Sequence, residues 1–197
     1  MSSAAILPRI LGALFYYSPQ RPEVKALIEC LPTLPSLYAW RDLHTITQLC
    51  EARPMDADEE PGWQYSVLFE GQGEMVAPPW GSVYLEKDNL LMGETTARYR
   101  GFLRSHGLAF DGQQQEPEDQ FGLMLLASSA FIERDNPRAA TALLEQFLLP
   151  WAPRYLECLQ HNHVSPFYAR LAQVAELYLQ DVKQQQGLNP VEARIFF

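Results

Sequence analysis

The sequence predicts an all-α protein: a single-domain helical bundle with one long loop rich in proline, glycine and aromatic residues. Its 197 residues fall within the usual size of one domain. Apolar residues recur three and four positions apart through most of the chain, which is the spacing of one helix face, and strand-like alternation is sparse. The composition, 47% hydrophobic, 12% aromatic and 20% charged, is that of a folded protein. We therefore expect residues 1–197 to form one domain.

The first half of the chain contains four segments with helical spacing. Between Gly71 and Gly93 this spacing is lost, and glycine, proline and aromatic residues predict a long loop. Within that loop, Val83–Leu85 is expected to be a short extended piece. The four predicted helices are, in order, a segment centred on Ile10–Phe15 with Pro8 in its first turn and its end before Pro19, Glu23–Leu31, Ser36–Glu51, and Trp63–Phe69 closed by Gly71.

The second half predicts further helices, one of them central. Phe121–Ile132 is apolar almost all round, so we expect it to be a buried helix in the middle of the bundle. Acidic residues are expected in its first turn, where they suit the helix dipole. The other predicted segments are Glu94–His106 capped by Gly107, a polar linker at Asp111–Gln115, Ala139–Leu148, a helix beginning near Pro153, and a long last helix that starts at Ser165–Pro166.

The charge narrows the classes of partner. Asp and Glu number 24 against 15 Lys and Arg, a net charge of −9. This surface repels nucleic-acid phosphates and anionic lipid, so we expect no nucleic-acid partner and no stable membrane insertion. A peptide that carries positive charges is electrostatically better matched.

The cysteines and the apolar segments indicate a cytoplasmic protein. Cys30, Cys50 and Cys158 are odd in number and widely spaced, which is typical of reduced thiols. The apolar run Ile10–Tyr17 follows Arg9, as in a signal peptide, but it has no small-residue cleavage site and ends at a proline. We interpret it as a helix of the folded protein.

Two aromatic groups are candidate binding residues. Tyr65, Leu68 and Phe69 have the spacing of one helix side, which by itself is more typical of ordinary core. Pro78 and Pro79 precede Trp80 in the predicted loop, and two prolines fix the backbone so that a large side chain is presented at a preset angle. The alternative, that the tryptophan folds back over the core, is equally compatible with the sequence.

An acidic group, Glu116, Glu118 and Asp119, gathers just before the central helix. Helix capping explains it sufficiently. A second interpretation is an anionic patch for an arginine-bearing ligand, held through charge-assisted hydrogen bonds. A third is a general acid and base, but no nucleophile or metal-ligand set accompanies these residues.

Motifs that would indicate an enzyme are absent from the sequence. There is no phosphate-binding Gly-x-x-x-x-Gly-Lys loop, no dinucleotide-binding glycine motif and no Gly-x-Ser-x-Gly elbow. Cys158, His161 and His163 do not have a convincing metal-ligand spacing. We therefore expect no catalytic residues, no metal and no cofactor.

Six short segments, taken in order, resemble the TorD/DmsD family of redox enzyme maturation chaperones, and most closely its DmsD branch. Each is weak alone, but their order and spacing form a specific signal that runs nearly end to end. They are Arg9-Ile10-Leu11-Gly12-Ala13-Leu14-Phe15-Tyr16-Tyr17, Tyr65-x-x-Leu68-Phe69-x-Gly71, Pro78-Pro79-Trp80-Gly81-Ser82-Val83-Tyr84, Glu116-Pro117-Glu118-Asp119, Pro150-Trp151 and Pro166-Phe167-Tyr168.

The resemblance implies an all-helical chaperone, not an enzyme. Its expected partner is the twin-arginine signal peptide of a molybdenum-cofactor oxidoreductase, in this branch the catalytic subunit of dimethyl sulfoxide reductase, whose export it delays until the cofactor is inserted. The twin-arginine translocase, reached at the inner membrane, stays open as a second partner. Two alternatives also stay open: an assembly factor for a mature apo-redox subunit, and a small helical hydrolase that uses Glu116 and Asp119.

The resemblance also implies a peptide-binding site. Our hypothesis is that the aromatic and proline positions receive the apolar part of the signal peptide while the acids face its arginines. One position departs from the family, which usually has histidine where this chain has Gln120, so the resemblance does not carry over a role that needs a cationic ring. The expected peptide-binding residues are Tyr65, Leu68, Phe69, Pro78, Pro79, Trp80, Glu116, Glu118, Asp119 and Gln120.

Overall fold

The computed structural model describes residues 3–51, 60–89, 91–109 and 116–197, and in this part of the chain every regular element is a helix. The predicted polar linker at Asp111–Gln115 lies outside the described residues. The elements are α1 Ser3–Tyr16, α2 Pro22–Glu29, the 3₁₀ helix η1 Leu31–Leu37, α3 Leu43–Glu51, α4 Pro61–Phe69, α5 Gly81–Leu85, α6 Glu94–Ser105, α7 Phe121–Glu133, α8 Pro137–Leu143, the π-helical turn η2 Leu144–Leu148, α9 Ala152–Gln160 and α10 Pro166–Gln185. The prediction of an all-α bundle is confirmed.

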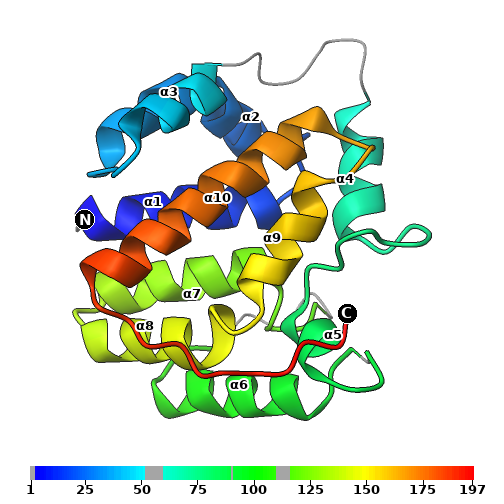
Figure 1. The fold of residues 1–197 in the computed structure, drawn as a ribbon, viewed down its shortest axis with the longest axis vertical. Coiled ribbons are helices and arrows are strands. Elements are labelled where there is room, and N and C mark those ends of the chain that lie inside the picture. The colour runs from blue at the N-terminus through cyan, green and yellow to red at the C-terminus, as the bar shows by residue number, and fades with distance from the viewer. Residues whose placement is uncertain (1–2, 52–59, 90, 110–115) are drawn as a thin grey trace.

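The core is built around α7, as its all-round apolar sequence predicted. Its residues from Phe121 to Leu125 are all buried, and its most extensive packing is with α1. Figure 1 shows α10 crossing the bundle, with α2 and α3 at one end and α6 at the other. The expectation that acids occupy the first turn of α7 is wrong, because that turn contains none.

Two glycines let α1 and α7 approach closely. A Cβ atom on Gly122 of α7 would lie 2.7 Å from the carbonyl oxygen of Gly12 and 2.9 Å from the amide nitrogen of Tyr16, both on α1. Ser129 of α7 also donates a hydrogen bond from Oγ to the carbonyl of Ala5 at 2.8 Å. The end of α1 is therefore fixed tightly against the start of α7.

Three local predictions are corrected. Ser36–Glu51 is not one helix, because the 3₁₀ helix η1 ends at Leu37, Tyr38 is extended and α3 begins only at Leu43. Pro8 lies in the second turn of α1 because that helix already begins at Ser3. Val83–Leu85 is not extended but part of the short helix α5.

A segment after α10 crosses the bundle and is fastened to α5. It runs past α8 and α6 in Figure 1. Its backbone donates from Val191 N to the Glu145 carbonyl and from Phe196 N to the Tyr84 carbonyl, both at 2.9 Å. The Phe197 ring meets that of Tyr84 edge to face. These contacts of the C-terminal segment with Tyr84 hold α5, which directly follows Trp80, in its position.

Candidate functional site

A cavity of about 380 Å³ opens where the ends of several elements meet. Its walls come from the end of α1, the turn that leads into α2, one side of α4 and the segment before α7. Polar and aromatic side chains dominate the lining, which suits a ligand that is charged at one point and flat or apolar around it. The residues that line it are Tyr16, Tyr17, Ser18, Arg21, Tyr65, Phe69, Glu70, Glu116 and Gln120.

The aromatic wall of the cavity is anchored in the core. Tyr65 and Phe69 are only 6% and 3% exposed. The Tyr65 hydroxyl donates to the carbonyl oxygen of Tyr16, which ties α4 to the end of α1. The Phe69 ring packs edge to face against Phe15 and Tyr168. Because these rings are fixed by the core, the shape of the cavity is set before a ligand binds. Burial also raises the pKa of the Tyr65 hydroxyl, so this group stays protonated.

Glu116 supplies the positioned negative charge of the cavity. Trp80 donates from its indole Nε1 to Glu116 Oε1 at 2.6 Å, which fixes the carboxylate. Burial, followed by repulsion from Asp119 and Glu70, raises the pKa of Glu116, although the indole hydrogen bond acts in the opposite direction. A partly buried carboxylate that is destabilised in this way gains most from a cationic partner.

A second acid and one base share the cavity. Glu70, at the end of α4, is exposed and accepts a hydrogen bond from the Ser66 hydroxyl. Arg21 stacks its guanidinium over the Tyr17 ring at 4.9 Å. The described residues place no carboxylate within ion-pair distance of Arg21, so its charge does not neutralise Glu116 directly.

Gln120 has a structural role that needs no positive charge. Its side-chain oxygen accepts from Leu123 N at 2.9 Å and so caps α7, while its Nε2 donates to the carbonyl of Phe15 at 3.2 Å. One side chain therefore caps α7 and joins it to α1 at the floor of the cavity. The capping role expected of the acidic group belongs to Gln120 instead.

The other two acids turn away from the cavity. Glu118 forms a bidentate ion pair with Arg100 of α6, in which Arg100 Nε and Nη2 donate to the two carboxylate oxygens at 2.5 and 2.7 Å. Burial alone would raise the pKa of Glu118, but the hydrogen bond and charge of Arg100 outweigh it and lower the pKa. Asp119 is 1% exposed and accepts from the backbone N–H of Ser82 at 2.7 Å. Neither carboxylate is therefore placed to meet a ligand in this cavity.

Asp119 belongs to a junction that positions Trp80. The backbones of residues 79–81 and 119–121 pair in antiparallel fashion, with Gly81 N donating to the Asp119 carbonyl and Phe121 N to the Pro79 carbonyl. Pro78 and Pro79 are buried here, and Trp80 is 7% exposed. The tryptophan thus folds back over the core, the second of the two interpretations that the sequence allowed.

Asp119→Ala is expected to lower the free energy of unfolding by about 1–3 kcal/mol, because it leaves the buried Ser82 N–H without its acceptor. Asp119→Asn keeps an oxygen at this point and should lose less. Urea denaturation of both variants at low and high salt checks this. A loss that disappears in high salt would contradict the structural role and indicate a charge exposed to solvent.

The cavity unites only part of the predicted site. Tyr65, Phe69, Glu116 and Gln120 line it. The remaining predicted residues do not line it: Leu68, Pro78, Pro79, Trp80, Glu118 and Asp119. Sequence reasoning did not select the other residues that line the cavity, which lie at or next to helix ends: Tyr16, Tyr17, Ser18, Arg21 and Glu70. Tyr16 and Tyr17 end the first segment of the family resemblance, so these paired tyrosines after an apolar helix were the signal available.

Neither a metal centre nor a membrane span emerges from the described residues. They contain no group of three His, Cys, Asp or Glu side chains that could hold an ion. Their helices are all too short or too polar to cross a bilayer. Cys30, Cys50 and Cys158 are unpaired, and burial raises the pKa of the Cys50 thiol to about 11.

Comparisons with known proteins identify the family. The family model described as nitrate reductase delta subunit matches residues 38–157. The chain is 34% identical to the Tat proofreading chaperone DmsD of Salmonella typhi over 194 residues, 98% of this chain and 95% of that protein. It is 29% identical to the chaperone protein YcdY of Escherichia coli K12 over 180 residues, 87% and 89% of the two chains.

The fold is shared with a solved structure. A redox enzyme maturation protein from Archaeoglobus fulgidus superimposes with a TM-score of 0.62 at 16% identity, covering 91% of this chain and 96% of that one. At this identity the likeness concerns the fold alone. The sequence matches show that this chain belongs to the TorD/DmsD family of redox enzyme maturation chaperones.

Proposed function

We propose that this protein is a chaperone that binds the twin-arginine signal peptide of a molybdenum-cofactor oxidoreductase and delays export until the cofactor is inserted. The expected client is the catalytic subunit of dimethyl sulfoxide reductase. We place the protein in the cytoplasm, with the twin-arginine translocase at the inner membrane as a second partner. Its curated relatives include proteins named Tat proofreading chaperones, which supports this assignment.

The observation that carries the proposal is the cavity with Glu116 in its wall. A guanidinium group needs a carboxylate and a flat apolar surface, and the cavity offers Glu116 and Glu70 beside the rings of Tyr16 and Tyr65. Glu116 is already held by Trp80, so little side-chain entropy is lost on binding. The net charge of −9 favours the approach of a basic peptide.

The hydrolase alternative loses support from the same geometry. It required Glu116 and Asp119 to act as a pair on one substrate. Asp119 is buried and does not line the cavity, so the two carboxylates do not face a common ligand. We therefore propose a binding function without catalysis and without a cofactor.

Calorimetric titration with a synthetic twin-arginine leader peptide tests the proposal. We expect binding of the native leader, and a loss of about tenfold to a hundredfold in affinity when both arginines are changed to glutamine, because charge-assisted hydrogen bonds are removed. A leaderless apo-client is the comparison for the assembly-factor alternative. Binding of that client, with no binding of the leader to the folded protein, would replace our proposal by that alternative.

A further inference from the structure

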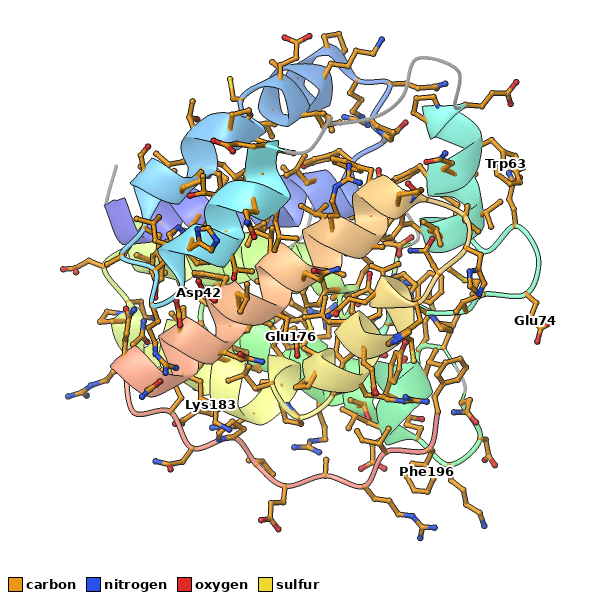
Figure 2. All side chains as sticks on the ribbon, turned by 45° about the horizontal axis from the view of Figure 1, so that its top comes forward. Asp42, Trp63, Glu74, Glu176, Lys183 and Phe196 are labelled. Atoms are coloured by element: carbon orange, nitrogen blue, oxygen red, sulfur yellow. The ribbon has the colours of Figure 1, made fainter. Side chains whose placement is uncertain are left out.

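One tryptophan of this protein lies on the surface instead of in the core. Trp63, in α4, is 55% exposed, whereas Trp40, Trp80 and Trp151 are 9%, 7% and 1% exposed. Figure 2 shows its side chain projecting from the outer side of the bundle, away from the core. An indole ring is among the most effective side chains for binding another protein, and leaving it in water forgoes a large apolar contribution to stability.

Trp63 is linked to the cavity along one side of its own helix. Trp63, Ser66 and Glu70 follow the spacing i, i+3 and i+7, so they lie on one side of α4, and Val67 at i+4 lies beside them. Glu70 lines the cavity and holds the Ser66 hydroxyl. Seven residues of helix rise about 10 Å. The Glu70 carboxylate in the cavity and the exposed Trp63 indole are therefore about 10 Å apart along α4.

The apolar residues first expected to receive a signal peptide are not available at the surface. Leu68 and Phe69 are each 3% exposed and Trp80 is 7% exposed. Phe69 is reached only inside the cavity, and contact with Leu68 or Trp80, which do not line it, would require the core to open. Trp63 and the half-buried Val67, by contrast, are accessible without any rearrangement.

We propose that Trp63, supported by Val67, is the surface that binds the apolar segment of the leader whose arginine enters the cavity. This inference rests on the proposed function and adds the place and the spacing of the second contact. The distance of about 10 Å corresponds to three residues of an extended peptide or seven of a helical one. The bound apolar side chain therefore follows the arginine by about three positions if the leader is extended, and by about seven if it is helical.

Two matched surface variants test the assignment. Trp63→Ser is expected to weaken leader binding about thirtyfold, the effect of removing a central aromatic anchor. Leu43→Ser removes an apolar side chain of similar exposure, 52%, from α3, outside the residues that line the cavity, and should leave the affinity unchanged. Trp63→Phe should restore most of the binding. Circular dichroism of each variant controls for folding.

A leader with its apolar segment made polar completes the experiment. This peptide should bind wild type as weakly as the native leader binds Trp63→Ser, with no further loss when the two changes are combined, because they remove the same contact. Unchanged affinity of Trp63→Ser for a leader that binds wild type would overturn this inference and leave the proposed function standing. A leader that fails to bind folded wild type at all would overturn both.

Tryptophan fluorescence gives an independent signal. Trp63 is the one tryptophan largely open to solvent, so acrylamide quenching of the free protein reports mainly on it. Saturation with the leader should reduce that quenching and shift the emission to shorter wavelength. The same quenching with and without bound leader would contradict the placement of the leader on Trp63.

Discussion

Glu116→Lys is expected to abolish measurable leader binding, and Glu116→Gln to reduce it about tenfold to a hundredfold. The charge reversal places a cation in the cavity where we propose that the guanidinium of the leader enters. The neutral variant retains an oxygen that can accept from Trp80 but loses the charge of the interaction, and hydrogen bonds to charged groups are worth about 1.5–3 kcal/mol. Calorimetry with the native leader measures both.

Glu116 also predicts how binding depends on pH. Its pKa is raised in the free protein, chiefly by burial, and a bound guanidinium would lower it again because the cation favours the charged carboxylate. Protonation therefore opposes binding, so leader affinity should fall as the pH drops through the raised pKa of Glu116 and level off above it. Glu116→Gln should remove most of this dependence.

The neighbouring acid provides the control. Glu118→Gln changes a carboxylate two positions away that is paired with Arg100 and does not line the cavity. We expect its leader affinity to stay close to that of wild type. If Glu118→Gln weakens binding as much as Glu116→Gln, the acidic group acts through its summed charge, and the cavity is not the arginine site.

The sequence predicted most helices because burial leaves a periodic pattern. The all-round apolar sequence predicted α7, and the pair Ser165-Pro166 predicted the start of α10. Ser165 does cap α10 in the structure. Ser36–Glu51 is not one helix, because the extended Tyr38 and the capping Asp42, which accepts from Thr45 N, separate η1 from α3. The local signal for the start of α3 is Asp42, a capping residue that apolar periodicity does not register.

The site was only partly predictable, because the direction of a side chain is decided by partners distant in sequence. Glu116, Glu118 and Asp119 are nearly adjacent, yet their partners are distant in sequence: Trp80 and Ser82 at the start of α5, and Arg100 in α6. The order of residues shows that three acids precede α7, but it does not show which of them faces the cavity. Trp80 was likewise predicted as a binding residue from the sequence. Its contact with Glu116 could not be predicted, because it depends on the backbone pairing of residues 79–81 with 119–121.

Gly122→Ala is expected to lower the free energy of unfolding by about 3 kcal/mol, at the upper end of the cost of overpacking. The new Cβ would lie 2.7 Å from the Gly12 carbonyl oxygen and 2.9 Å from Tyr16 N. Both are backbone atoms of α1, so they cannot turn aside as a side chain can, and α1 and α7 must separate. For a domain of this size the loss corresponds to a melting temperature lower by roughly 6–12 °C in thermal denaturation.

Gly101→Ala is the matched control because it makes the same substitution in a helix without the contact. Gly101 is exposed in α6, and a Cβ there would meet nothing within 4 Å. It should therefore gain up to about 1 kcal/mol from helix propensity. If both variants raise the melting temperature, propensity dominates and the close approach of α1 to α7 is not a constraint.

The same substitution reaches the cavity, because Gly122 lies beside Tyr16 N and would place its Cβ 3.0 Å from Gln120 Oε1. Tyr16 lines the cavity, and Gln120 joins the floor of the cavity to α1 through the Phe15 carbonyl. Separation of α1 from α7 would therefore widen the site and move Tyr16 away from Glu116. We expect folded Gly122→Ala, measured well below its melting temperature, to bind the leader more weakly than wild type, while Gly101→Ala binds it unchanged. Equal affinities would mean that the cavity tolerates the displacement of α1, and that its shape is set by α4 and Glu116 alone.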